Sequence, residues 1–334
     1  MTKNSAAPAA NRSSNASCGI DLTKFLCTFL VIAIHFPPFS QVHFQSADTM
    51  NFVLSMVLAR IAVPFFFMAT GYFLLGSDNP DRVMGYCTKI LRLCGIWSMI
   101  LLLGSHGHLW YLKATVAAVI AVSVCLRWLK LPLVCVLGFG LYVIGLLGDS
   151  YYGFLEPLRR FGLVDTVIRI YDLRFGTTRN GFFMGFPFVL MGAWFARTGF
   201  TMRTSRAILG LVPTLALMVA EAAILKSHGI CRDYNMYLLL LPASFFFFAL
   251  AASLRLKPRP IYVHLRSIGA LNYYTHIMVG HLLGYLFTAL LRLTGIDLEP
   301  HSYLVVTAVT MLIATGIYQL SRKEKFTWLQ YLYR

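Results

Sequence analysis

Apolar residues along this chain form long runs that short polar loops separate at nearly regular intervals. A transmembrane helix needs about 20 predominantly apolar residues to cross the hydrocarbon core of a bilayer. By that measure the sequence contains ten candidate spans: 22–40, 50–75, 84–104, 109–126, 131–148, 181–197, 206–225, 234–254, 268–291 and 302–321. The pattern predicts an all-α fold, a polytopic integral membrane protein of about ten transmembrane helices.

The polar stretches outside these runs predict the domain organisation. Residues 1–18 lack the apolar core of a signal peptide, and we expect a disordered cytoplasmic tail there. Residues 19–322 form one membrane domain, and residues 323–334 form a basic cytoplasmic tail. The one long connection, 149–180, is rich in charge, and its pattern leaves three roles open: re-entrant, amphipathic or acceptor-binding.

Composition supports the membrane interpretation, because only 13% of the residues are charged whereas 58% are hydrophobic. A soluble domain carries about 25% charged residues. The net charge of +16 does not indicate a nucleic-acid-binding protein, since the basic residues lie in pairs and triplets between apolar runs. With a cytoplasmic N-terminus, eighteen Lys and Arg fall on the cytoplasmic side and eight on the other. The positive-inside rule therefore places both termini in the cytoplasm.

The first span carries two ionisable side chains at membrane depth, where such groups are costly and are functional candidates by default. Lys24 and His35 are eleven residues apart, which is almost three whole helical turns. Both side chains thus share one face and lie roughly 16 Å apart along the axis. Histidine suits general-base work near neutral pH. An equally weighted alternative has Lys24 reaching the interface and His35 capping the helix before Pro37.

Other ionisable residues carry weaker signals. Arg60 lies about ten residues into the second span, which favours an inward-facing role. His276 lies in an aromatic helix, where a histidine is usually a packed core residue, and His108 falls near a loop and needs no special role. The seven cysteines form no CxxC or Cys/His cluster, so we expect buried free thiols and no metal site.

Five segments, in order, resemble the acyltransferase family 3 proteins, the bacterial integral-membrane acyltransferases. These segments are GIDLTKFLCTFLVIAIHFPPF, AVPFFFMATGYFLLG, GHLWYLKA, RNGFFMGFPFVLMGAWFA and YYTHIMVGH. In the first, an acidic residue precedes an Arg-x10-His motif in the family. Asp21 and His35 match it, whereas Lys24 stands in place of the usual arginine and Thr70 replaces a serine in the second segment. The membrane half of serine/alanine racemase-type proteins is a branch of this family that the chain also resembles.

The resemblance implies a multi-pass protein of the bacterial cell membrane that moves an acyl group, usually acetyl from acetyl-CoA, onto a hydroxyl of a carbohydrate or other envelope-associated acceptor. It implies no bound cofactor, since acetyl-CoA or another acyl-CoA is a substrate. Some family members carry a fused soluble domain, and a separate soluble partner is left open here.

From these motifs and from the charges at membrane depth, we assign hypothetical roles to the candidate residues. His35 and Lys24 would be catalytic, with His35 as the base or transient acyl acceptor. Asp21, Arg60, Arg179 and His276 would bind substrate or acyl-CoA, with Arg60 on the donor and Arg179 on an acceptor carboxylate or phosphate. The alternative function is a membrane permease or transport module for a small polar substrate such as an amino acid, in which the same charges form the binding site.

Overall fold

The computed structural model describes residues 7–39, 47–101, 107–296 and 302–334, with the side chains of residues 7–17, 47 and 175 left out. Within these ranges all regular elements are helices. The α-helices are α1 (Ala7–His35), α2 (Ala47–Asn51), α3 (Ala62–Leu74), α4 (Pro80–Ile100), α5 (Trp110–Trp128), α6 (Leu131–Leu147), α7 (Gly162–Phe175), α8 (Phe186–Thr198), α9 (Thr204–Ser227), α10 (Leu240–Ser253), α11 (Pro260–Thr294) and α12 (Ser302–Leu320). Shorter 3-10 and π segments are η1 (Phe52–Val57), η2 (Leu58–Ile61), η3 (Gly107–Leu109), η4 (Tyr152–Phe154), η5 (Glu156–Arg160), η6 (Gly181–Gly185) and η8 (Glu324–Leu332).

The predicted all-α class is confirmed, and the helices indicate a multi-pass membrane protein. Among the described residues, six helical segments are long and apolar enough to cross a membrane, and seven if the bent pair formed by 131–147 and 152–160 counts as one span. The six are Cys18–His35, Asp48–Leu74, Gly107–Trp128, Thr204–Ser227, Pro260–Thr294 and Ser302–Leu320. Helices such as α10 are apolar but shorter, so the count of ten spans and the orientation of the termini stay predictions.

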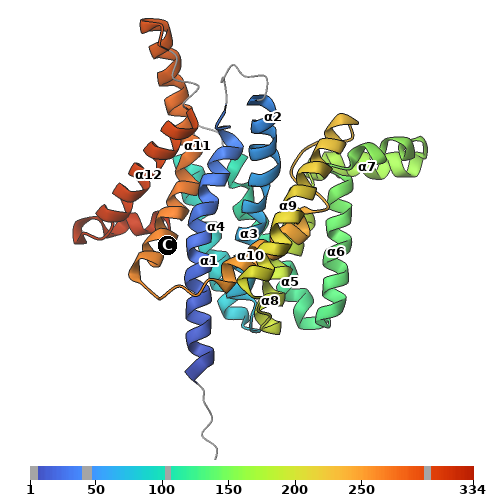
Figure 1. The fold of residues 1–334 in the computed structure, drawn as a ribbon, viewed down its shortest axis with the longest axis horizontal. Coiled ribbons are helices and arrows are strands. Elements are labelled where there is room, and N and C mark those ends of the chain that lie inside the picture. Colours follow the sequence, from blue (N-terminus) through green and yellow to red (C-terminus); the bar gives the residue numbers. More distant parts are fainter. Residues whose placement is uncertain (1–6, 40–46, 102–106, 297–301) are drawn as a thin grey trace, which may run out of the picture.

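Helix α1 runs through the centre of the molecule (Figure 1). It packs against α3, α10 and α11, while α12 lies against α11 on one side. Helices α6 and α7 lie on the other side, with α7 turned away from α6 (Figure 1). Helices α3 and α8 lie so close together that a side chain at Gly71 or Gly192 would overlap the backbone of the facing helix. Such close glycine contacts are typical of helix pairs in membranes.

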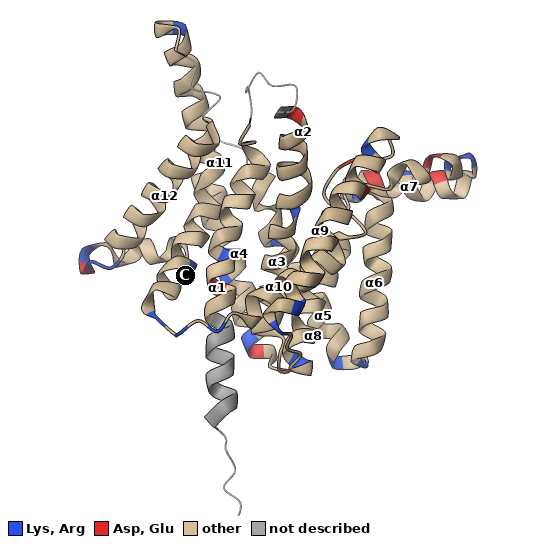
Figure 2. Cartoon of the chain, viewed as in Figure 1, with Lys and Arg blue, Asp and Glu red and all other residues tan. Residues whose placement is uncertain are grey.

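The charged residues gather near the ends of the helices and in the loops, while the middle of the bundle is mostly uncharged (Figure 2). Large apolar side chains face outward on several helices, for example Leu209, Leu293 and Leu312. A water-soluble surface would not expose so many large apolar side chains, whereas lipid solvates them. The distribution therefore supports the membrane assignment.

The second predicted span, 50–75, is not one regular helix. The chain passes from α2 through the π-helix η1 and the 3-10 helix η2 before it continues as α3. Changes of helix type alter the angular spacing of side chains and often occur at functional sites. Arg60 lies in the 3-10 segment of this break.

The long connection 149–180 contains η4, η5 and α7. Helix α7 exposes an apolar stripe at helical spacing, formed by Leu163, Val167, Ile170 and Leu173. Three of its charged residues form ion pairs, which join Asp165 to Arg169 and Asp172 to Arg232. Of the three roles left open for this connection, the stripe favours the amphipathic one.

Candidate functional site

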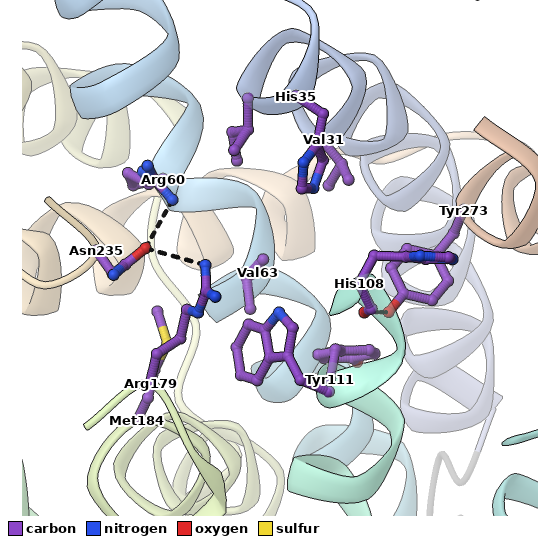
Figure 3. Close-up of a pocket in the computed structure, with 12 residues that line it drawn as sticks. Val31, His35, Arg60, Val63, His108, Tyr111, Arg179, Met184, Asn235 and Tyr273 are labelled. Atoms are coloured by element: carbon purple, nitrogen blue, oxygen red, sulfur yellow. Dashed lines mark hydrogen bonds between the residues drawn. The ribbon is translucent and has the colours of Figure 1, made fainter. Parts of the chain in front are cut away.

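A cavity in the middle of the bundle brings together residues from six different parts of the chain (Figure 3). Its empty space amounts to about 470 Å³, including a part that opens to the surroundings. The lining residues are Val31, Ile34, His35, Arg60, Val63, His108, Trp110, Tyr111, Arg179, Met184, Asn235 and Tyr273. Three of the six side chains proposed from the sequence thus line one cavity, namely His35, Arg60 and Arg179.

His35 is the last residue of α1, and its imidazole points into the cavity (Figure 3). The side chain is exposed to that space. Its ring centroid lies 5.3 Å from that of His276, which comes from α11 and is fully buried. The His276 ring in turn lies 5.4 Å from that of His108. The end of α1 therefore meets two further histidines.

The tautomer of His276 follows from its hydrogen bonds. Its Nδ1 atom lies 2.7 Å from the carbonyl oxygen of Tyr273. A carbonyl oxygen can only accept, so Nδ1 carries a hydrogen and donates a hydrogen bond to it. Its Nε2 atom makes no hydrogen bond within the described part of the chain. With Nδ1 protonated, Nε2 presents a lone pair. His276 is thus a further polar group beside His35.

Two arginines reach the opposite side of the cavity from irregular segments. Arg60 lies in η2 and is buried, and its Nη1 atom donates to Oδ1 of Asn235 at 2.8 Å. Arg179 directly precedes Asn180, whose side chain caps the π-helix η6 by accepting from two backbone N–H groups. The Nη1 atom of Arg179 donates to the same Oδ1 atom of Asn235, at 3.3 Å (Figure 3).

Asp149 fixes the orientation of the Asn235 amide. The Asn235 Nδ2 atom donates to Oδ2 of Asp149 at 3.0 Å, and the backbone N–H groups of Asn235 and Met236 donate to Oδ1 at 2.8 and 3.0 Å. Asp149 is 1% exposed, so these bonds satisfy a carboxylate that is cut off from solvent. The amide nitrogen faces Asp149, and the amide oxygen is left for the two arginines.

Asp21 and Lys24 do not line this cavity. Asp21, in the middle of α1, accepts two hydrogen bonds from the guanidinium of Arg266 of α11, and the Nε–Oδ1 distance is 3.0 Å. Lys24 is within electrostatic range of Asp21, Arg266 and Lys89. Because α1 is one continuous helix, this polar group is separated from His35 by several turns.

Sequence reasoning did not single out several residues of the cavity. His108 was expected to need no role, yet it is 5% exposed and lines the cavity beside Tyr273. Its place in the GHLWYLKA segment was a usable signal. Asn235 and Asp149 gave no comparable signal, because an asparagine and an aspartate in polar loops are ordinary in any sequence.

The described residues contain no group of three or more His, Cys, Asp or Glu side chains with the geometry to hold a metal ion. Chemically, the cavity offers one base, His35, and two cationic hydrogen-bond donors, Arg60 and Arg179, on the side that faces it. Aromatic side chains form the walls, and the guanidinium of Arg179 lies 5.0 Å from the centre of the Trp110 ring. Such a site suits a reaction in which negative charge develops on oxygen.

Comparison with known proteins agrees with the motifs. Residues 19–105 match the profile of the acyltransferase family 3, whose description is "Acyltransferase domain". Two amino-acid racemases of Enterococcus faecalis are 27% and 30% identical to the chain, over 72% and 66% of its length and over 36% and 35% of their own. The serine/alanine racemase of Enterococcus gallinarum is 25% identical over 94% of the chain and 47% of its own length.

The chain spans between about a third and a half of the length of these curated relatives. No solved structure matches it. The family match includes α1 with His35 and the irregular segment with Arg60, two of the cavity's three candidate residues. Residues 19–105 therefore match the acyltransferase family 3 domain, and the chain is distantly similar to part of these racemases.

Proposed function

We propose that this protein is a membrane acyltransferase that moves an acyl group, acetyl in the first instance, from acyl-CoA to a hydroxyl of a carbohydrate or other envelope-associated acceptor. The observation that carries the proposal is the position of His35. The family's histidine lies at the end of α1 and faces a cavity that also holds Arg60 and Arg179. We place the protein in the bacterial cell membrane.

In the proposed reaction, His35 takes the proton of the acceptor hydroxyl as its oxygen attacks the thioester carbonyl. The new C–O bond forms and the C–S bond breaks, and the proton passes from His35 to the departing CoA sulfur. The products are an ester and free CoA. Arg60 and Arg179 line the same cavity, and their positive charges favour both an anionic substrate group and the negative charge that develops on the carbonyl oxygen.

The donor enters from the cytoplasm in this scheme. The distribution of Lys and Arg supports a cytoplasmic position for the N-terminal half of α1, within the proposed ten-span topology that has both termini in the cytoplasm. Lys24 lies there with Lys89 and Arg266 in electrostatic range, a basic environment suited to CoA phosphates. Cysteine-accessibility labelling of the 76–80 and 149–161 loops from opposite sides tests this topology.

A second function has support from the relatives. They are named amino-acid racemases and serine/alanine racemase, and the chain matches only part of each. A cavity with two cations and an exposed histidine also suits the recognition of a small polar substrate such as an amino acid, as in a permease. A permease transfers no acyl group and hydrolyses no acetyl-CoA, so one assay separates the two.

The assay follows label from acetyl-labelled acetyl-CoA into envelope material, in membranes that hold equal amounts of wild-type or variant protein. We expect transfer with the wild type and with His281→Gln, which changes an exposed histidine on α11, and loss of transfer with His35→Gln. Identification of the labelled product names the acceptor. If well-inserted wild-type protein gives neither transfer nor hydrolysis, uptake of labelled amino acids decides for the permease.

A further inference from the structure

Arg60 and Arg179 are 119 residues apart in the chain, yet both donate to a single oxygen atom. That oxygen belongs to the neutral amide of Asn235. Two like charges thus converge on an acceptor that carries no charge. In a poorly solvated setting the mutual repulsion of the two cations is costly, and a neutral amide offsets little of it.

Three other arginines around this region are paired differently. Arg159, Arg169 and Arg232 each form an ion pair with a carboxylate of the connection. Among the described residues, no ion pair includes Arg60 or Arg179. The Nε atoms of both also lack a hydrogen-bond partner there.

The nearest buried carboxylate, Asp149, is within electrostatic range of Arg60 but forms no ion pair with either arginine. Asp149 is occupied by the Asn235 amide, by two backbone N–H groups and by the hydroxyl of Ser150. Its position behind Asn235 orients the amide so that only the oxygen reaches the arginines. Asp149 and Asn235 therefore hold the two guanidinium groups together without filling their remaining donors.

We propose that Arg60 and Arg179 form one anion-binding site, which takes an oxyanion of the substrate, a carboxylate or a phosphate, beside His35. This deepens the proposed function and rests on it. It differs from the division of labour expected from the sequence, in which Arg60 contacts the donor and Arg179 the acceptor. Guanidinium groups match planar and tetrahedral oxyanions through paired N–H donors.

The proposed site selects substrates that carry an anionic group together with a hydroxyl or an amine. A molecule bound here carries its anionic group at the arginine pair and presents a hydroxyl or amine to His35 across the cavity. Two sources of the anion are compatible with the geometry. It belongs either to a small acceptor or to a phosphate of CoA, and the two are separated by the choice of probe.

The test measures the unfolding temperature of the full chain in detergent, titrated with sodium propionate, sodium phosphate or CoA at constant ionic strength. We expect saturable stabilisation of the wild type by at least one probe, since ligands that bind the native state raise its stability. Arg60→Gln and Arg179→Gln should weaken that binding by at least about tenfold. Arg174→Gln, an exposed arginine of α7, serves as the control and keeps the response.

Stabilisation by propionate or phosphate but not by CoA assigns the anion to a small acceptor, and stabilisation by CoA alone assigns it to the donor. The inference is overturned if no probe stabilises the wild type, or if both glutamine variants respond as the wild type does. His35→Gln keeps the anion response. If Arg179→Gln leaves acyl transfer unchanged, the result contradicts the anion-binding site alone. If anions stabilise the protein but no acyl transfer occurs, the result contradicts the proposed function alone.

A double variant tests the proposal independently of the glutamine variants, which is needed if those fail to fold. Asp149→Asn combined with Asn235→Asp moves the carboxylate into contact with both arginines and keeps an amide behind it. We expect this protein to unfold at a higher temperature than the wild type and to lose its response to added anions, because the anion is now built in. A double variant that still responds to anions like the wild type contradicts the proposal.

Discussion

Two regions of this molecule bury arginine-linked polar groups, and they do so in opposite ways. In the middle of α1, Asp21 forms a closed pair with Arg266, in which the carboxylate accepts from two guanidinium nitrogens. At the C-terminal end of α1, the cavity holds Arg60 and Arg179 on a neutral amide. The Asp21–Arg266 pair itself is neutral, whereas the residues that line the cavity include two arginines and no carboxylate.

The contrast separates a structural role from a binding role. A buried ion pair with both partners present joins two helices and leaves little capacity for a ligand. Two cations without a carboxylate have donors left over, and such groups inside a membrane protein mark substrate sites. The comparison predicts that substitutions in the closed pair change stability, while substitutions around the cavity change activity at nearly constant stability.

The largest effect is expected at His35. Removal of a general base costs typically 10²- to 10⁴-fold in rate, and His35→Gln should lower acyl transfer by about that factor while the unfolding temperature stays within about 2 °C of the wild type. Initial rates of acetyl transfer in proteoliposomes, with the unfolding temperature of the same preparations, measure both. Transfer by His35→Gln at more than a tenth of the wild-type rate would contradict a role as base.

Asp21→Asn tests the closed pair. The variant keeps the shape of the side chain and removes the charge that Arg266 contacts. Asp21 is buried but Arg266 is half-exposed, so we expect a loss of about 1–2 kcal/mol, below the 3–5 kcal/mol of a fully buried pair. The free energy of unfolding in detergent measures it. Asp165→Asn, which breaks an exposed pair within α7, is the control and should cost less than about 0.5 kcal/mol.

The comparison also shows how far the sequence reached. Apolar runs located the helices well, because hydropathy depends on neighbouring residues alone. The break at Phe52–Ile61 was predicted as ordinary helix, since a change from π to 3-10 geometry leaves no mark on composition. The partners of the arginines were out of reach for a related reason: Asn235 is 175 residues from Arg60 and 86 from Asp149 in the chain.

Helical periodicity placed Lys24 and His35 on one face of α1, and the structure gives them different surroundings. His35 lines the cavity, whereas Lys24 is near Asp21, Arg266 and Lys89. Spacing within one helix fixes direction but not what the neighbouring helices bring to that face. The neighbours decide which residue meets open space.

Lys24 provides the third prediction, intermediate in size. In the proposed scheme its charge attracts the donor, so Lys24→Met should lower kcat/KM for acetyl-CoA by about tenfold or more, chiefly through KM. Lys24→Arg keeps the charge and restores the family's usual residue, and it should retain or raise activity. The measurement is the rate of transfer as a function of acetyl-CoA concentration. A Lys24→Met protein with unchanged kinetics would remove this residue from the reaction.

The smallest effect is expected at His276. Its buried ring lies 5.3 Å from that of His35 and touches no open space of its own, so its contribution is to position His35. Small displacements of a catalytic group reduce rate without weakening substrate binding. His276→Asn should therefore lower kcat about three- to tenfold and leave KM for acetyl-CoA unchanged, whereas His264→Asn, a histidine that contacts Tyr318, should change neither. A rise in KM equal to the loss in kcat/KM would instead assign His276 to substrate binding, and the open end of α1 would then have a third binding residue beside the two arginines.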